Sequence, residues 1–348
     1  MRVSVIIPFF NDHYIIGETV RRATVGIDPK EIEVIVVDDG SMFAPPSSLK
    51  EYPNVKVITN GVNRGVGHAF DTGAKSAVGD VLVLMGSDIY LEERKWLTDA
   101  LNTAKSNENG LTASCCVGVQ VGDNAEVAKY GNKRYGADLL FTVTKDDLPA
   151  QSPLRELPVY ADILQAKWLR EVNTTGQHEV PCVLGACYVT TKDWYMHIGG
   201  WGWVKDHDRL SKEESRWTGH RRWGGLEPMI SLKTWFAGGS CQVNPLWETG
   251  HVFGRGDHVG EVRGRQEDKY IFNKLLMAYS LFEGDMTKKL VNHLPLGKRN
   301  AQLAQKIIRK NWKAIMLEKK FNDKVKIFDE SLFMDKFGYG IDPKKPVF

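Results

Sequence analysis

The chain of 348 residues has no apolar run of about 18 residues, the length at which a segment becomes a candidate membrane-spanning helix. Its first residues, MRVSVIIPFFND, enter a strand-like apolar run at once and lack the basic leader and cleavage site of a secretory signal. We therefore expect no membrane span, no secretory signal and a cytoplasmic location.

Cysteine is scarce, and its spacing lacks the CxxC pairs of zinc sites. The chain has five cysteines, an odd number that does not suit a set in which every cysteine forms a disulfide. We therefore expect free thiols in a reducing compartment. The five are Cys115, Cys116, Cys182, Cys187 and Cys241.

Acidic residues are nearly absent from one stretch of the chain. Residues 288–326 contain twelve Lys or Arg side chains but only Glu318 and Asp323 as acidic ones, a local net charge of +10 in a chain of net charge +3. A basic region on an otherwise acidic body predicts an anionic partner, either a nucleic acid or a membrane surface. A solvated helix face would have the same composition, and the sequence leaves both interpretations open.

In the first 120 residues, short apolar runs typical of strands alternate with stretches typical of helices. The alternation predicts an α/β fold whose mostly parallel sheet is covered by helices on both faces. Ligands bind at the carboxyl ends of the strands in such sheets, where this sequence has ND, DDGS, NGVNRG and GSD. The expected strands are 3–8, 34–37, 55–59 and 81–85, and the expected helices are 15–22, 67–77 and 92–104.

The rest of the chain changes in character twice. A block rich in Trp and Gly is followed by a region whose apolar residues have helical spacing. We expect three parts, residues 1–120, 121–268 and 269–348, of which the last is a helical basic extension.

Two carboxylates follow strands of the expected sheet. Asp39 in DDGS can accept hydrogen bonds from a nucleobase or a ribose, although these residues also form a good turn. Asp88 in MGSD can bind a hard divalent cation, or it can cap a turn.

The spacing of these pieces resembles the N-terminal half of family 2 glycosyltransferases, which have the Rossmann-like GT-A fold. That family's pattern is a strand ending P-x-Y-N-E, a second ending D-D-G-S, an N-x-G loop, and A-x-G-D before a D-x-D. The positions that match are Pro8, Asn11, Asp39, Asn63, Gly65, Gly79, Asp80 and Asp88.

The resemblance implies a site for a UDP-sugar. The end of the first strand and Asp39 would hold the uracil and ribose, and Asp88 would help to bind Mn²⁺ or Mg²⁺ on the diphosphate. The residues of this half that are expected at the nucleotide-sugar are Pro8, Phe10, Asn11, Asp39, Gly86 and Ser87.

The chain departs from that pattern at two positions. Gly86 replaces the first Asp of D-x-D, and Phe70 stands where many relatives have an Arg. We expect Arg64 or His68 to supply the missing phosphate or base contact, although His68 also fits a helix residue without a role.

The second half, with WGG at 223–225 and GHVF at 250–253, resembles polypeptide N-acetylgalactosaminyltransferases and related polysaccharide polymerases. The two halves together cover roughly residues 1–255 at family spacing. The resemblance implies that Trp223, Gly224 and Gly225 contact the nucleotide-sugar, and that His251 is the second metal ligand beside Asp88.

Glu227 lies at the offset where inverting relatives have their general base, while Leu226 replaces the acidic residue before it. A carboxylate there can take the proton of the acceptor hydroxyl. We therefore expect an inverting enzyme with Glu227 as base; the alternative is a helix cap. Residues 254–265 resemble the loop that closes over the donor, with Arg255 at the diphosphate.

These features predict a metal-dependent glycosyltransferase that uses a UDP-sugar. For the acceptor we expect a hydroxymethylated pyrimidine in phage DNA, bound through the basic C-terminal region in the cytoplasm of a bacterium or of a virus-infected host cell. The alternatives are a bacterial surface polysaccharide or lipid-linked glycan, and a module that binds nucleotide-sugar or nucleic acid but has lost catalysis.

Overall fold

The computed structural model describes residues 1–92, 94–121, 127–140, 164–169, 174–185, 187–202, 225–252, 267–292, 294 and 299–338. In these ranges, no helix combines the length and the apolar character that crossing a membrane requires. All five cysteines are buried free thiols, as expected.

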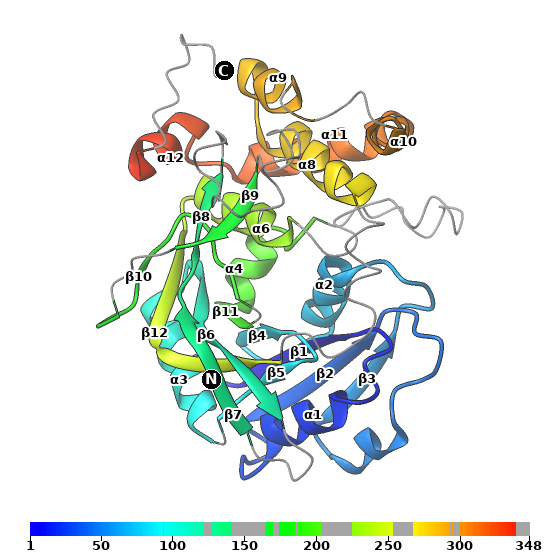
Figure 1. The fold of residues 1–348 in the computed structure, drawn as a ribbon, viewed down its shortest axis with the longest axis vertical. Coiled ribbons are helices and arrows are strands. Elements are labelled where there is room, and N and C mark those ends of the chain that lie inside the picture. The colour runs from blue at the N-terminus through cyan, green and yellow to red at the C-terminus, as the bar shows by residue number, and fades with distance from the viewer. Residues whose placement is uncertain are drawn as a thin grey trace.

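One large mixed sheet forms the centre of the fold (Figure 1). Its strand order is β10-β12-β6-β11-β4-β1-β2-β3, and β1 pairs in parallel with both β2 and β4. The four strands expected from the sequence are confirmed as β1 (Val3–Phe9), β2 (Ile32–Asp38), β3 (Val55–Thr59) and β4 (Val81–Met85).

The other half of the sheet breaks the parallel order. Strand β11 pairs antiparallel with both β4 and β6, and the two-residue strand β5 pairs antiparallel with β12. These strands are β5 (Ile89–Tyr90), β6 (Gly110–Val121), β7 (Val127–Arg134), β10 (His178–Glu179), β11 (Cys187–Thr191) and β12 (Ser240–His251), while β8 (Ala137–Leu140) and β9 (Gln165–Trp168) form a separate pair.

Helices cover both faces of the sheet, which explains the continuous apolar runs of β1, β2 and β4. Val5 and Ile7 of β1 pack in the cluster that contains α1 (Ile16–Thr24) and α3 (Lys95–Ser106). Ile6, which points to the other face, packs in the cluster that contains α2 (Val66–Ser76) and α6 (Leu226–Phe236). The expected α/β architecture is therefore confirmed.

The C-terminal part is helical, as expected, and lies beyond α6 in Figure 1. Helix α8 packs against α6, α10 and α11, and its Phe272 and Leu275 belong to the same core cluster as α2. The division into three parts stays a prediction, but these helices share the core of the sheet. They are α8 (Glu267–Leu281), α9 (Gly284–Asn292), α10 (Arg299–Lys310), α11 (Trp312–Val325) and α12 (Glu330–Phe337).

A turn at residues 199–202 follows α4 (Lys192–His197) and packs tightly against α2. The buried carboxylate of Asp71 accepts hydrogen bonds from the Tyr195 hydroxyl at 2.5 Å and from the backbone N–H of Trp201 at 3.0 Å. Gly200 has φ 53°, and a Cβ there would lie 2.1 Å from the Asp71 Oδ1 atom. The turn therefore requires glycine at this position.

The pH dependence of stability should report the burial of Asp71. Burial raises the pKa of Asp71 from 3.8 to about 6, so the native state holds this proton more tightly than the unfolded state. This contribution to the free energy of unfolding is present at low pH and is lost as the pH rises through the shifted pKa. Between about pH 4 and about pH 7 the loss amounts to about 3 kcal/mol.

Asp71→Asn keeps the Oδ1 acceptor but cannot ionise. Its free energy of unfolding in urea should therefore rise relative to that of the wild type by about 3 kcal/mol over that pH range. A difference that stays constant with pH would contradict the account of this buried carboxylate.

Candidate functional site

The candidate site begins where β1, β2 and β3 end side by side. Phe9 lies opposite Asp38, and Asp38 lies opposite Thr59, so the residues that follow these strands meet at one edge of the sheet. In open α/β sheets this edge is where ligands bind.

Asn11 joins the end of β1 to the DDGS turn. Its backbone N–H donates to Ser41 Oγ at 3.0 Å, and its side-chain Oδ1 accepts from the backbone N–H of Met42 at 2.9 Å. The preceding Phe10 is 45% exposed and available to a ligand, whereas Pro8 lies within β1 opposite Val37.

Asp39 is 3% exposed, and its carboxylate holds the glycine loop that precedes α2. It accepts hydrogen bonds from the backbone N–H groups of Arg64 at 3.0 Å and Gly65 at 2.6 Å, and from Asn60 Nδ2 at 2.9 Å. Gly40 makes the approach possible, because a Cβ there would lie 2.5 Å from the backbone nitrogen of Asn63. The sequence predicted a ligand contact for Asp39 and missed this structural role.

Arg64 and His68, two alternatives in the sequence, are neighbours in the structure. His68 Nε2 lies 3.4 Å from an Arg64 Nη1 atom, and His68 Nδ1 lies 3.3 Å from both Asn60 Nδ2 and Thr72 Oγ1. Through Asn60 this group is connected to Asp39, so Arg64, in the loop before α2, and His68, in the first turn of α2, belong to one hydrogen-bonded group.

Asp88 and His251 meet although they are distant in the sequence. The Asp88 Oδ2 and His251 Nε2 atoms are 3.4 Å apart. The pairing of β5 with β12 creates this contact, since Ile89 lies opposite His251 and the Asp88 carbonyl accepts from the Val252 N–H at 3.0 Å. Burial lowers the pKa of His251, against the opposing effect of the Asp88 charge, and so favours the neutral imidazole that binds metals.

Gly86 and Ser87, which directly precede Asp88, lie close to the carboxylates of this region. A Cβ on Gly86 would lie 2.6 Å from Asp88 Oδ1, so an aspartate at position 86 would displace the carboxylate that is present. Ser87 is buried and donates to Asp12 Oδ2 at 2.6 Å.

Asp12 is a residue that the sequence analysis did not select. Burial raises the pKa of Asp12, and the charge of Asp88 adds to this effect, so the two carboxylates are close enough to interact. The signal in the sequence was its place in ND, directly after Asn11. Within the described ranges, no group of three or more His, Cys, Asp or Glu side chains is arranged to hold a metal.

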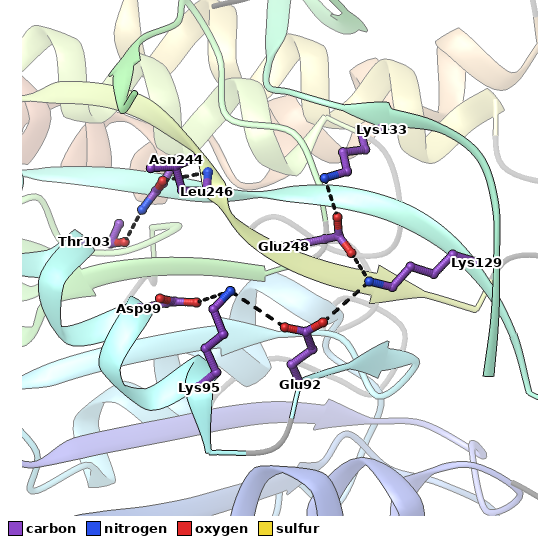
Figure 2. Close-up of polar contacts among 9 residues, drawn as sticks. All are labelled: Glu92, Lys95, Asp99, Thr103, Lys129, Lys133, Asn244, Leu246 and Glu248. Carbon is purple, nitrogen blue, oxygen red and sulfur yellow. Dashed lines mark hydrogen bonds and ion pairs between the residues drawn. The ribbon is translucent and has the colours of Figure 1, made fainter. Parts of the chain in front are cut away.

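An ion-pair network links β7, β12 and the segment that follows β5, as Figure 2 shows. Lys129 on β7 binds Glu248 on β12 and lies 3.5 Å from Glu92, which follows β5. Lys133 adds a second contact to Glu248 at 2.7 Å. Because Lys129 is 49% exposed, each contact stabilises the fold by no more than about 1 kcal/mol. This network depends on contacts between distant segments and was not predicted from the sequence.

Glu227 lies in the first turn of α6, after Gly225, whose φ of 77° is left-handed. The Tyr188 hydroxyl on β11 donates to Gly185 O at 2.6 Å and contacts Glu227 Oε1 at 3.3 Å. Burial raises the pKa of Glu227, while contacts with its own backbone N–H and with Tyr188 oppose the shift. A carboxylate with a raised pKa is a suitable general base, although the contact with its own N–H also fits the capping alternative.

Several predicted residues lie outside the described ranges. These are Trp223, Gly224 and the whole of the expected closing loop at 254–265 with its Arg255. Their roles stay predictions.

Asp39→Asn should destabilise the protein. The new amide would direct N–H groups at backbone N–H donors, and hydrogen bonds to a charged group contribute about 1.5–3 kcal/mol. We expect the free energy of unfolding in urea to fall by about 2–3 kcal/mol. Asp38→Asn is the matched control, because its Oδ1 can still accept from the Ser41 N–H. Equal losses in the two variants would contradict the role given to Asp39.

Known proteins resemble this chain in sequence. Residues 4–156 match the model of glycosyl transferase family 2. Polypeptide N-acetylgalactosaminyltransferase 16 of Homo sapiens is 24% identical over 255 residues, which are 72% of this chain and 40% of that protein. Polypeptide N-acetylgalactosaminyltransferase 10 of Rattus norvegicus is 21% identical over 260 residues, which are 72% of this chain and 37% of that protein. The chain therefore spans about two fifths of the length of these relatives.

The fold is similar to that of a solved relative. The crystal structure of GalNAc-T7 with UDP, GalNAc and Mn²⁺ superposes with a TM-score of 0.64 at 16% identity, over 99% of this chain and 59% of that one. The expected family resemblance and fold are thus confirmed. The protein has the GT-A fold, and its residues 4–156 match the model of glycosyl transferase family 2.

Proposed function

We propose that the protein is a metal-dependent glycosyltransferase that moves a sugar from a UDP-sugar to a hydroxyl acceptor. The observation that carries this proposal is the contact of Asp88 with His251 at the ligand-binding edge of a GT-A sheet. The related GalNAc-T7 was solved with UDP, GalNAc and Mn²⁺, which supports the same donor chemistry for this chain.

One carboxylate and one neutral imidazole fit a divalent transition ion such as Mn²⁺, and Mg²⁺ is the alternative. Such ions are often held by one or two protein groups together with substrate phosphates, so Asp88 and His251 are sufficient as protein ligands. When bound, the ion would stabilise the charge of the departing UDP.

The donor nucleotide would lie along the ends of β1 and β2. Phe10 offers an exposed ring for the base, and Asn11 shapes the turn beside it. Arg64 lies on the loop that Asp39 holds and His68 in the first turn of α2, where they can meet the base or the phosphates. The assignments of Gly86, Ser87, Arg255 and residues 223–225 to this site are part of the same proposal.

Glu227 would act as the general base of an inverting reaction. Its carboxylate would take the proton of the acceptor hydroxyl as the oxygen attacks the anomeric carbon. The raised pKa of Glu227 supports this role, because the carboxylate binds a proton more readily than an ordinary glutamate does.

For the acceptor we propose a polyanion, a hydroxymethylated pyrimidine in DNA. The support is the basic C-terminal region, whose exposed cations on α10 and α11 are Lys306, Arg309, Lys310, Lys313, Lys320 and Lys324. Such an acceptor would place the reaction in the cytoplasm of a bacterium or a virus-infected cell. A surface polysaccharide or lipid-linked glycan is the alternative, and a peptide belongs on the same panel because the relatives are named for polypeptides.

The proposal is tested by UDP release with Mn²⁺ and a panel of UDP-sugars, with and without hydroxymethylcytosine DNA, glycans and peptides. Three results would support the transferase activity, the DNA acceptor and the base together. Modified DNA should stimulate UDP release, salt should weaken that stimulation, and Glu227→Gln should abolish the release. Stimulation by a glycan or a peptide alone would contradict the proposal that DNA is the acceptor but would still support glycosyltransferase activity. No release with any sugar would favour a binding module.

Tyr188→Phe should change the pH profile. Its hydroxyl lowers the pKa of Glu227, so its removal raises that pKa further. The acidic limb of the pH–rate profile should move to higher pH, because the base must be deprotonated to act. An unmoved limb, with transfer still dependent on Glu227, would exclude this contact as an influence on the base.

Loss of either proposed metal ligand should weaken Mn²⁺ binding in the presence of UDP. We expect Asp88→Ala and His251→Ala each to lower the affinity by more than about tenfold, measured by calorimetry. Asp99→Ala is the control, since Asp99 lies on α3 and pairs only with Lys95 among the contacts in Figure 2. If both ligand variants bind like this control, the metal site is wrong.

A further inference from the structure

Trp201 contacts the chain directly beside the proposed base. Its side chain is 1% exposed, and its Nε1–H donates to the Leu226 carbonyl at 2.8 Å. Leu226 is the first residue of α6 and precedes Glu227. The N-cap residue of this helix, Gly225, supplies no side-chain cap. The indole N–H therefore adds a donor to the first carbonyl of α6, and it does not replace an N-cap, which would accept from backbone N–H groups.

The ring of Trp201 is fixed by α2. It stacks on Phe70 with a centroid distance of 5.0 Å and an interplanar angle of 22°. Gly67 allows this close approach, because a Cβ there would lie 3.1 Å from the Trp201 side chain. Helix α2 begins at the loop that the Asp39 carboxylate holds, so the indole rests on the element next to the nucleotide edge.

The backbone around Trp201 is held from two sides. On one side Asp71 Oδ1 accepts from the Trp201 N–H at 3.0 Å. On the other, the ammonium group of Lys233 on α6 donates to Gly199 O at 3.4 Å and to Glu318 Oε1 on α11 at 3.0 Å.

We propose that Trp201 is a positioning residue for Glu227. Its indole N–H fixes the Leu226 carbonyl and thereby the direction in which the first turn of α6 presents the carboxylate. This proposal rests on the function proposed above, in which Glu227 is the base. Trp201 does not act on the substrate, so its effect should appear in the catalytic step and not in donor binding.

Trp201→Phe keeps an aromatic ring and removes the N–H. We expect kcat for transfer to fall by about tenfold or more, since small displacements of a catalytic group are costly. The KM for the UDP-sugar and the affinity for UDP should stay within about twofold, because no donor contact changes. The acidic limb of the pH–rate profile should also shift, which a loss of packing alone would not produce.

Trp96→Phe is the matched control. Trp96 is equally buried, lies on α3 in the other core cluster, and its Nε1 has no hydrogen-bond partner within the described part of the chain. It therefore loses the same atoms and no hydrogen bond. If Trp201→Phe folds poorly, benzothienylalanine at position 201 keeps the indole shape without the N–H, and the same loss of kcat is expected.

The outcomes separate this inference from the proposed function. If Glu227→Gln abolishes transfer while both phenylalanine variants have equal kcat and equal pH profiles, the positioning role is overturned and the base stands. If Glu227→Gln transfers sugar like the wild type, the base assignment fails first. A parallel rise in the donor KM of the Trp201 variant would also contradict the proposal, because it would indicate a general disturbance of the site.

Discussion

The buried carboxylate of Asp39 is the interaction on which the edge formed by the ends of β1, β2 and β3 depends. A charged group at 3% exposure must be compensated, and here the compensation comes from two consecutive backbone N–H groups and one side-chain amide. These contacts set the path of the glycine loop and hence the start of α2. The position of Arg64 and His68, and the surface on which Trp201 rests, follow from where that helix begins.

The second half of the site depends on a different kind of constraint. Strand β5 is only two residues long, yet its pairing with β12 is what brings a carboxylate from one half of the chain to an imidazole from the other. The ion pairs of Lys129 reinforce the same junction from the solvent side. The geometry of this pair therefore comes from strand pairing in the sheet and not from local loop structure.

The N-terminal half could be predicted because its strands are buried on both faces and so appear as continuous apolar runs that end in polar motifs. The same motifs pointed to Asn11, Asp39 and Asp88, which do follow strand ends in the structure. The antiparallel insertion of β11 and the pairing of β5 could not be predicted, because they depend on contacts between distant segments. The burial of α6 could not be predicted either, because a lysine such as Lys233 normally faces solvent, whereas here it is buried.

The contact of Lys233 with Glu318 ties the basic C-terminal helices to α6. Both side chains are largely shielded from water, and removing one partner of such a pair leaves an uncompensated charge that costs about 3–5 kcal/mol. The helices that carry the exposed lysines therefore cannot be gained or lost as an independent module. Their positive charge is built into the same folding unit as the sheet, so loss of these helices would also disturb the packing of α6, which carries Lys233.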